Sequence, residues 1–466
     1  MPTRPRRGSH TVGRHGLVLG GGFAGMLAAH VLTPYVDRVT VVERDVPPDG
    51  PGPRRGVPQA RHSHLLMGAG ARTVEELLPG TLAAWSEAGA HLLSAPGEVA
   101  FLTKCGWLPR VRHKEYVVSC GRDPLDWVVR RRVLRDPRVR LLAHTEVEAL
   151  LGDSARVSGA RVVDRGTGRT TEIEADFVVT ATGRSSRLES WWEDLGLPAV
   201  PHELVDAGTA YATRLFRPDP ATHRATPGIV MIANVTGQAT GGVLLPIQDG
   251  LWTATVIGMR GSEPPTGEDE FFDFAKRLPH PALAELIAEA VPQGPVRGFR
   301  RLANRRLRFD RVPRHPEGLV VLGDAACVLN PSHAHGMTVA AFGVAALRDG
   351  LRRYGNAPGV AGRVQRATSR AARTAWELSV SDDLRHPTVI GPRPSVATRL
   401  QNAYADRVLR TAVTDPAVAR SLVDVIALAR PTTSLGAPRV LAPALLGRAR
   451  RPAPGGTGDP LVPRAD

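Results

Sequence analysis

The sequence predicts an α/β fold with three parts: a discontinuous Rossmann-type domain, an antiparallel-sheet domain inserted into it, and a C-terminal helical region. Three observations predict it. Near the N-terminus an apolar run, a glycine motif and a helical pattern follow one another, as in a strand–turn–helix unit. Short β-prone segments replace this pattern from about residue 201. A buried strand followed by a small-residue helix then returns from residue 320.

The N-terminal unit contains a GxGxxG motif at residues 20–25, between the apolar run 16–19 and a helical pattern. Gly20 permits the tight turn, Gly22 lets a pyrophosphate approach the backbone, and Gly25 lets the helix pack closely. The amides and dipole of the helix N-terminus would hold the phosphates. A glycine-rich structural turn is the alternative interpretation of this motif.

Glu43 ends the β-branched run 39–42, where such units carry the acidic residue that accepts hydrogen bonds from ribose hydroxyls. A carboxylate at this position repels a 2′-phosphate, so the adenosine half belongs to FAD or NAD rather than NADP. The correctly placed acid favours the nucleotide site over the structural turn.

Residues 111–200 mix helix and strand, with a helix expected over 125–133 and strands over 139–142 and 177–180. The sheet of the first domain therefore continues through this segment.

Residues 201–258 contain short β-prone segments, such as 229–235 and 242–247, and Asp249-Gly250 is typical of a hairpin turn. This segment predicts a second, antiparallel layer.

The late strand ends at Gly323-Asp324 and leads to Gly336-Met337 and a helix that extends to about residue 347. An aspartate at a strand end can bind a ribityl hydroxyl, and the helix would direct its positive end at the N1 and O2 region of a flavin. An ordinary turn is the alternative for this motif alone. Together with the GxGxxG motif, it favours FAD over NAD.

Beyond residue 350 the pattern is helical and then rich in proline and glycine. We therefore expect an FAD-binding domain at 14–200 and 297–350, a substrate-binding sheet domain at 201–296, a helical region at 351–446, and disordered tails at 1–13 and 447–466.

Composition limits the classes of partner. The net charge of +15 rests on arginines spread along the chain, with three lysines among 60 cations, and no nucleic-acid-binding pattern accompanies it. Three cysteines provide no disulfide framework. Arg6-Arg7 could suggest export, but the apolar stretch after it contains the glycine motif, and no apolar run is long enough to span a bilayer. We expect a cytoplasmic protein without a membrane span.

The chain resembles the FAD-dependent monooxygenases of the aromatic hydroxylase and squalene epoxidase type, and most closely the polyether epoxidases of monensin and lasalocid biosynthesis. The resemblance is strongest at residues 54–59 with His62 and His64, at 181–185, at 323–337, and at Trp376 with 383–385. It implies that Arg55 and Gln59 lie near the flavin or its ribityl chain, Arg122 near FAD, and Val147 near adenine. The cofactor-binding residues expected in total are Gly20, Gly22, Phe23, Ala24, Gly25, Glu43, Arg44, Arg55, Gln59, Arg122, Val147, Gly323, Asp324, Gly336 and Met337.

Two departures from this resemblance concern the chemistry. The segment Ser332-His333-Ala334-His335 replaces a small or aromatic residue followed by Gly-Gln, so two imidazoles could face the flavin ring. His333, His335 and Pro331 are therefore the catalytic candidates. The Asp-Gly motif of many aromatic hydroxylases is replaced by residues 182–184, Thr-Gly-Arg. The reductant is then NAD(P)H acting directly or through a separate flavin or ferredoxin reductase.

Two His-x-His segments, 62–64 and 333–335, have a spacing that metals use, but no acidic or cysteine cluster matches them, and we expect no metal site. For His62 and His64, an ordinary hydrogen-bonded role and a flavin-site role remain equally open.

The sequence thus predicts an FAD-dependent monooxygenase that uses O2 as co-substrate. By the resemblance, it would epoxidise alkenes of a hydrophobic, polyketide-like intermediate of antibiotic biosynthesis through a flavin C4a-hydroperoxide. The protein would position the substrate and exclude water. The first alternative is a non-redox cyclase of polyketide biosynthesis in which FAD is structural. The second, an NAD(P)-linked dehydrogenase, lacks a second nucleotide motif.

Overall fold

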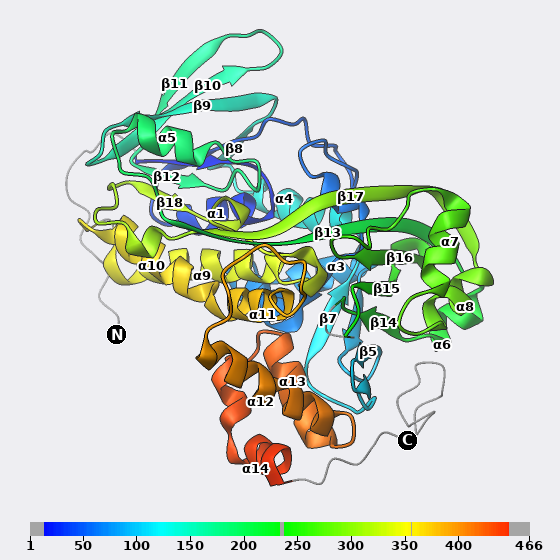
Figure 1. Cartoon of the computed structure of the whole chain (residues 1–466). Helices are drawn as coiled ribbons and strands as arrows, with labels where there is room; N and C mark the ends of the chain where they lie inside the picture. The colour runs from blue at the N-terminus through cyan, green and yellow to red at the C-terminus, as the bar shows by residue number, and fades with distance from the viewer. Residues whose placement is uncertain (1–13, 234–236, 356, 447–466) are drawn as a thin grey trace, which may run out of the picture.

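The computed structural model describes residues 14–233, 237–355 and 357–446, so the tails expected at 1–13 and 447–466 lie outside the described residues. Its architecture confirms the predicted fold class: a parallel sheet covered by helices, a large sheet that is mostly antiparallel, and a group of C-terminal helices (Figure 1).

The parallel sheet has five strands in the order β18-β12-β1-β2-β8. These are β18 (Leu319–Val321), β12 (Phe177–Thr180), β1 (His15–Leu19), β2 (Arg38–Val42) and β8 (Val139–Leu142). Every neighbouring pair is parallel. Val179 of β12 is paired with Val320 of β18, so the predicted late strand does return to the first sheet.

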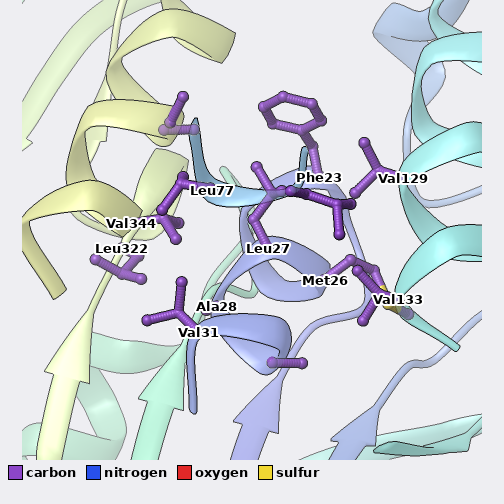
Figure 2. Close-up of a cluster of buried hydrophobic side chains, with 14 of the residues drawn as sticks. Phe23, Met26, Leu27, Ala28, Val31, Leu77, Val129, Val133, Leu322 and Val344 are labelled. Carbon is purple, nitrogen blue, oxygen red and sulfur yellow. The ribbon is translucent and has the colours of Figure 1, made fainter. Parts of the chain in front are cut away.

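Helices pack on this sheet through a continuous apolar core. They include α1 (Phe23–Leu32), α2 (Gly68–Leu77), α4 (Arg122–Val133) and α9 (Gly336–Tyr354). Figure 2 shows Met26 of α1 beside Val133 of α4, while Val344 of α9 approaches the core from the other side. Burying such side chains removes apolar area from water at about 25 cal/mol per Å². The packing fixes the start of α1 relative to the start of α9.

The eight-stranded sheet has the order β19-β17-β13-β16-β15-β14-β5-β6. It consists of β5 (Val99–Thr103), β6 (Gly106–Trp107), β13 (His202–Arg217), β14 (Gly228–Met231), β15 (Thr240–Ile247), β16 (Leu251–Gly258), β17 (Val291–Leu307) and β19 (Cys327–Val328). The predicted hairpin is present: β15 and β16 are antiparallel, and Asp249 has a φ of 65° in the turn. The sheet domain was expected at residues 201–296, but the sheet also includes β5 and β6 from earlier in the chain. Its strand β17 continues past residue 296 to Leu307.

Two small antiparallel sheets complete the β-structure: β9 (Thr145–Gly152), β10 (Val157–Asp164) and β11 (Thr170–Glu174), and β3 (Leu65–Met67), β7 (Tyr116–Ser119) and β4 (His91–Ser94). Among the described residues before 360, the other α-helices are α3 (Thr81–Glu87), α5 (Leu188–Asp194), α6 (Pro220–Ala225), α7 (Glu268–Lys276) and α8 (Ala282–Ala288).

The C-terminal region is helical as predicted, with α10 (Val360–Ala371), α11 (Arg373–Asp383), α12 (Val396–Ala412), α13 (Pro416–Ile426) and α14 (Pro438–Leu446). Ala372 separates α10 from α11. Among the described helices, none combines the length and the apolar character that crossing a membrane requires.

Candidate cofactor site and active site

A cavity of about 600 Å³ joins the two sheets. It is lined by the residues that follow β1, β2, β12 and β18, by the start of α9, and by side chains of β13 and β17. Of the cofactor-binding residues predicted from the sequence, those that line it are Gly20, Gly22, Phe23, Ala24, Glu43, Arg44, Arg55, Gln59, Arg122, Val147, Gly323, Asp324, Gly336 and Met337.

The glycine turn has the geometry that its motif predicts. Gly20 has a φ of +101°, and a Cβ there would lie 2.4 Å from the carbonyl oxygen of Ala181. A Cβ on Gly25 would lie 1.8 Å from the carbonyl oxygen of Gly20, so Gly25 supports the turn from beneath rather than lining the cavity. At Gly22 the nearest atom to a Cβ would be 3.8 Å away, which leaves the backbone open to the cavity.

Glu43 is buried, and two backbone amides hold its carboxylate. The amide of Gly21 donates to Oε2 at 2.8 Å, and that of Asp45 donates to Oε1 at 3.0 Å. A carboxylate can accept about four hydrogen bonds, so capacity is left for a ribose hydroxyl. The ribose contact itself stays a prediction.

A buried charge network lies beside the glycine turn. Asp126 accepts a hydrogen bond from Arg54 Nη2 at 3.0 Å and one from Arg122 Nε at 2.7 Å. Burial alone would raise the pKa of Asp126, but the two guanidinium groups outweigh it and hold the pKa below its usual value. Arg54 also lies 3.4 Å from the carboxylate of Glu43. Two guanidinium groups close to the turn suit the phosphates of a dinucleotide.

Sequence reasoning named Arg55 and Arg122 but did not identify Arg54 as a site residue. The partner of Arg54, Asp126, is 72 positions away, and no local pattern connects the two. Arg54 also lies far from the glycine motif in sequence, although it contacts the carbonyl oxygen of Gly21 in the fold.

The late motif faces the same cavity. Gly323 has a φ of +60°, and Asp324 follows it at the cavity wall. Burial raises the pKa of Asp324, although Arg122 and Arg184 oppose this shift. Gly336 begins the 19-residue helix α9, and no atom would lie within 4 Å of a Cβ there. The positive end of the helix is therefore open to the cavity.

His62 and His64 both line the cavity. This places them at the expected flavin site, but it does not distinguish a role toward the flavin from ordinary hydrogen bonding. Thr213 Oγ1 lies 2.8 Å from His62 Nδ1, and His64 Nδ1 donates to the carbonyl oxygen of His62 at 2.8 Å. Burial lowers the pKa of both imidazoles to about 4, with smaller contributions from Arg61 and Arg122 respectively. Both are therefore neutral near pH 7.

The far end of the cavity is predominantly apolar. Phe299 and Leu302 of β17 and Tyr211 of β13 form one wall, and Ala334 lies on the loop before α9. The ring of Phe299 lies 5.6 Å from that of His62. Burial raises the pKa of Tyr211 well above its usual value, so its phenol stays protonated.

The structure corrects the expected orientation of His333 and His335, because neither side chain lines the cavity. Pro331 and Ala334 do, and Ala334 has a φ of 55°. His333 ends a 3-10 turn and His335 precedes α9, and across the left-handed Ala334 the two imidazole rings stack with their centroids 6.0 Å apart. The predicted catalytic role of the histidines therefore has no contact with the cavity to support it.

Both histidines instead support the loop before α9. His333 Nε2 lies 3.7 Å from Asp383 Oδ1; burial lowers the pKa of His333, but Asp383 outweighs it and the net shift is upward. His335 Nε2 donates to the carbonyl oxygen of Ile426 at 2.8 Å. Burial and the neighbouring His333 lower the pKa of His335 to about 3.

A second buried network fixes the start of this loop. Asn330 Nδ2 donates to Asp383 Oδ2 at 3.0 Å, and Asn304 Nδ2 donates to the same oxygen at 2.6 Å. The backbone amide of Asn330 donates to Asn304 Oδ1 at 2.7 Å. Residues from β17, the loop and α11 thus hold the cavity wall in one position.

Comparisons with known proteins agree with this geometry. Residues 15–379 match the family described as FAD binding domain. The protein Rv3254 of Mycobacterium tuberculosis is 32% identical over 418 residues, which is 87% of this chain and 87% of that protein.

Two solved structures share the fold. One is p-nitrophenol 4-monooxygenase PnpA from Pseudomonas putida DLL-E4, with a TM-score of 0.61 and 18% identity over 89% of this chain and 98% of that one. The other is the Diels-Alderase PyrE3 of the pyrroindomycin pathway, with a TM-score of 0.60 and 17% identity over 89% of this chain and 80% of that one. At such identities the likeness shows the fold alone.

Proposed function

This chain belongs to the FAD binding domain family, and on that premise we propose that it is an FAD-dependent monooxygenase acting on a hydrophobic substrate. One observation carries the proposal: a single cavity joins the glycine turn and the charged residues beside it to an apolar end walled by β13 and β17. A nucleotide site alone would need only the first of these two ends.

The residues present fit FAD. The open backbone at Gly22 and the guanidinium groups of Arg54 and Arg122 would hold the pyrophosphate, and Glu43 would hold the ribose. Asp324 and the start of α9 would bind the ribityl chain and the ring. When bound and reduced, FAD supplies the activation of O2 and the transfer of one oxygen atom.

At the apolar end the protein itself would position the substrate and exclude water from the reacting atoms. Phe299, Leu302 and the protonated phenol of Tyr211 would exclude water from the reacting region. The neutral imidazoles of His62 and His64 would offer hydrogen bonds without adding charge. Oxygen transfer to an alkene needs no strong general base, which agrees with these neutral groups.

The finer assignment is epoxidation of one or more alkenes in a polyketide-like intermediate. The apolar lining of the far end supports it. We further propose that the reducing equivalents come from NAD(P)H, directly or through a separate reductase.

The decisive experiment is turnover of a panel of polyenes by the FAD-loaded protein under ¹⁸O₂, with the flavin reduced photochemically so that no reductase is needed. We expect products that are heavier than the substrate by one ¹⁸O atom for each oxygenation. Products that are oxygenated without the label would contradict oxygen transfer from O2.

A second candidate is a non-redox cyclase that keeps FAD as a structural group, and the shared fold of the Diels-Alderase PyrE3 favours keeping it. The two candidates differ in mass balance, because a cyclised product is an isomer of its substrate. Protein loaded with 5-deaza-FAD and assayed without O2 should be inactive as a monooxygenase. Full activity under these conditions would replace the first proposal with the second.

A further inference from the structure

A second cavity, which we call the basic groove, opens between helices α13 and α14 and the segments that flank β4, β5 and β7. Its volume is about 870 Å³, and it shares no lining residue with the first cavity. In Figure 1, α13 and α14 lie below the lower ends of β5 and β7. The groove is thus a separate site on the C-terminal side of the molecule.

Five permanently cationic side chains line the basic groove, and they come from three separate parts of the chain. They are Arg112, Lys114, Arg420, Arg430 and Arg439. The two acidic residues of the lining are Glu98 and Asp424. The lining therefore carries an excess of positive charge.

The carboxylate of Asp424 is already engaged. It is buried, and it lies 2.8 Å from His113 Nε2 and 3.2 Å from Arg430 Nε. Glu98 accepts a hydrogen bond from the backbone amide of Ser94 at 2.8 Å. Within the described part of the chain, the four other cations of the groove form no ion pair with a carboxylate.

Some arginines elsewhere on the surface are paired, whereas others, such as Arg140 and Arg169, also form no ion pair with a described carboxylate; what distinguishes these four is that they gather around one hollow. Arg161 pairs with Glu172 at 3.0 Å on the small β9–β11 sheet, and Arg214 pairs with Glu268 at 2.8 Å. Four like charges around one hollow repel one another, and an anion placed between them removes that repulsion. The planar forks of three arginines match the oxygens of a phosphate group in particular.

We propose that the basic groove binds a phosphate-bearing small molecule. Its volume falls within the range of about 300–1,000 Å³ that is typical of small-molecule sites. A nucleic-acid-binding surface is expected to have its cations in a stripe along a helix or strand. The cations of the basic groove instead surround a hollow. The proposal is independent of the proposed function, because it uses none of the residues that line the first cavity.

The test is calorimetric titration of inorganic pyrophosphate into the FAD-loaded protein, so that FAD already fills the phosphate-binding residues of the first cavity. We expect saturable binding of one pyrophosphate for each chain. The double variant Arg112→Gln/Arg420→Gln should weaken it at least tenfold. Both positions lie on the groove surface, and the single variant Lys114→Gln provides a milder second test.

The matched control is Arg140→Gln/Arg169→Gln, which removes two exposed arginines outside the groove and lowers the net charge equally. It should leave pyrophosphate affinity within about twofold of wild type, with full FAD occupancy in all variants. Binding that does not saturate, or that falls equally in the control, would overturn the proposal. Stronger competition by a hexaglutamate peptide than by AMP would also overturn it, in favour of an acidic protein partner.

Discussion

The two ends of the first cavity, between the glycine turn and the wall of β13 and β17, differ in their electrostatics. At the glycine turn, four charged side chains lie close together: Glu43, Arg54, Arg122 and Asp126. At the far end the imidazoles of His62 and His64 are held neutral by burial; the rings of Tyr211 and Phe299 lie beside His62, while Arg122 acts on His64 from the charged end. Charge is concentrated at the glycine turn, whereas the wall formed by Phe299, Leu302 and the protonated Tyr211 is neutral, with Arg184 as the cation close enough to act on Tyr211.

This difference teaches how one cavity can serve two purposes. Charge-assisted hydrogen bonds give strong, directional binding to phosphates and ribose. A neutral wall excludes water and binds any substrate of suitable shape.

The largest effect should come from breaking the charged end. Asp126→Ala removes the carboxylate between Arg54 and Arg122 and leaves one buried and one partly buried cation without it. We expect the apoprotein to lose about 3–5 kcal/mol of unfolding free energy, measured in urea. The control Asp273→Ala breaks an exposed pair with Lys276 and should cost about 1 kcal/mol or less. An equal loss of unfolding free energy in the two variants would mean that the buried network stabilises the fold no more than an exposed ion pair does.

A smaller effect should separate the two ends in cofactor binding. Glu43→Gln keeps the shape of the side chain but removes its charge, so FAD affinity should fall by about 1.5–3 kcal/mol. His64→Gln at the neutral end should change it by less than about 1 kcal/mol. Titration of the apoproteins with FAD, followed by flavin fluorescence, measures both. A larger loss for His64→Gln than for Glu43→Gln would reverse the assignment of the two ends.

The third effect concerns acid and accumulates only as the pH falls. Burial lowers the pKa of His62 and His64 to about 4 and that of His335 to about 3, so below pH 6.5 the unfolded chain binds protons that the folded chain does not. Unfolding free energy should be fully present above pH 6.5 and fall as the pH approaches 4. Each group contributes up to about 1.4 kcal/mol per pH unit. His333 acts in the opposite direction because its pKa is raised in the folded protein. Its contribution to the unfolding free energy is lost as the pH rises through that pKa.

His335→Gln tests this directly, since an amide can still donate to the carbonyl oxygen of Ile426. Its unfolding free energy should fall less steeply than that of wild type between pH 6.5 and 4, while the two proteins run parallel above pH 7. Identical slopes in acid would show that His335 titrates normally in the folded protein.

The charged end was partly visible in the sequence, because a strand, a glycine turn and an acidic residue follow one another within 30 residues. Residues close in sequence have few ways to be arranged, so Gly20, Gly22 and Glu43 lie where the motif puts them. Arg54 was not predicted to be a site residue, because its hydrogen-bond partner, Asp126, is distant in sequence.

The neutral end was much less predictable. Its wall depends on the pairing of β13 with β17, two strands separated by more than 70 residues, and on the contact of Asn330 with Asp383. His333 and His335 were expected to face the ring, but the direction of a loop side chain depends on local backbone torsion. Ala334, with its φ of 55°, takes the inward position.

The place of β18 in the parallel sheet has a consequence for how the chain is made. Strand β12 ends at Thr180, yet its outer partner begins only at Leu319, about 140 residues later. At a synthesis rate of about 5–20 residues per second, the apolar edge at Val178 and Val179 waits on the order of ten seconds for its neighbour. During that interval the growing polypeptide presents an unpaired parallel edge, the kind of surface on which other chains aggregate. Covering this edge during synthesis would therefore favour folding of the chain over its aggregation.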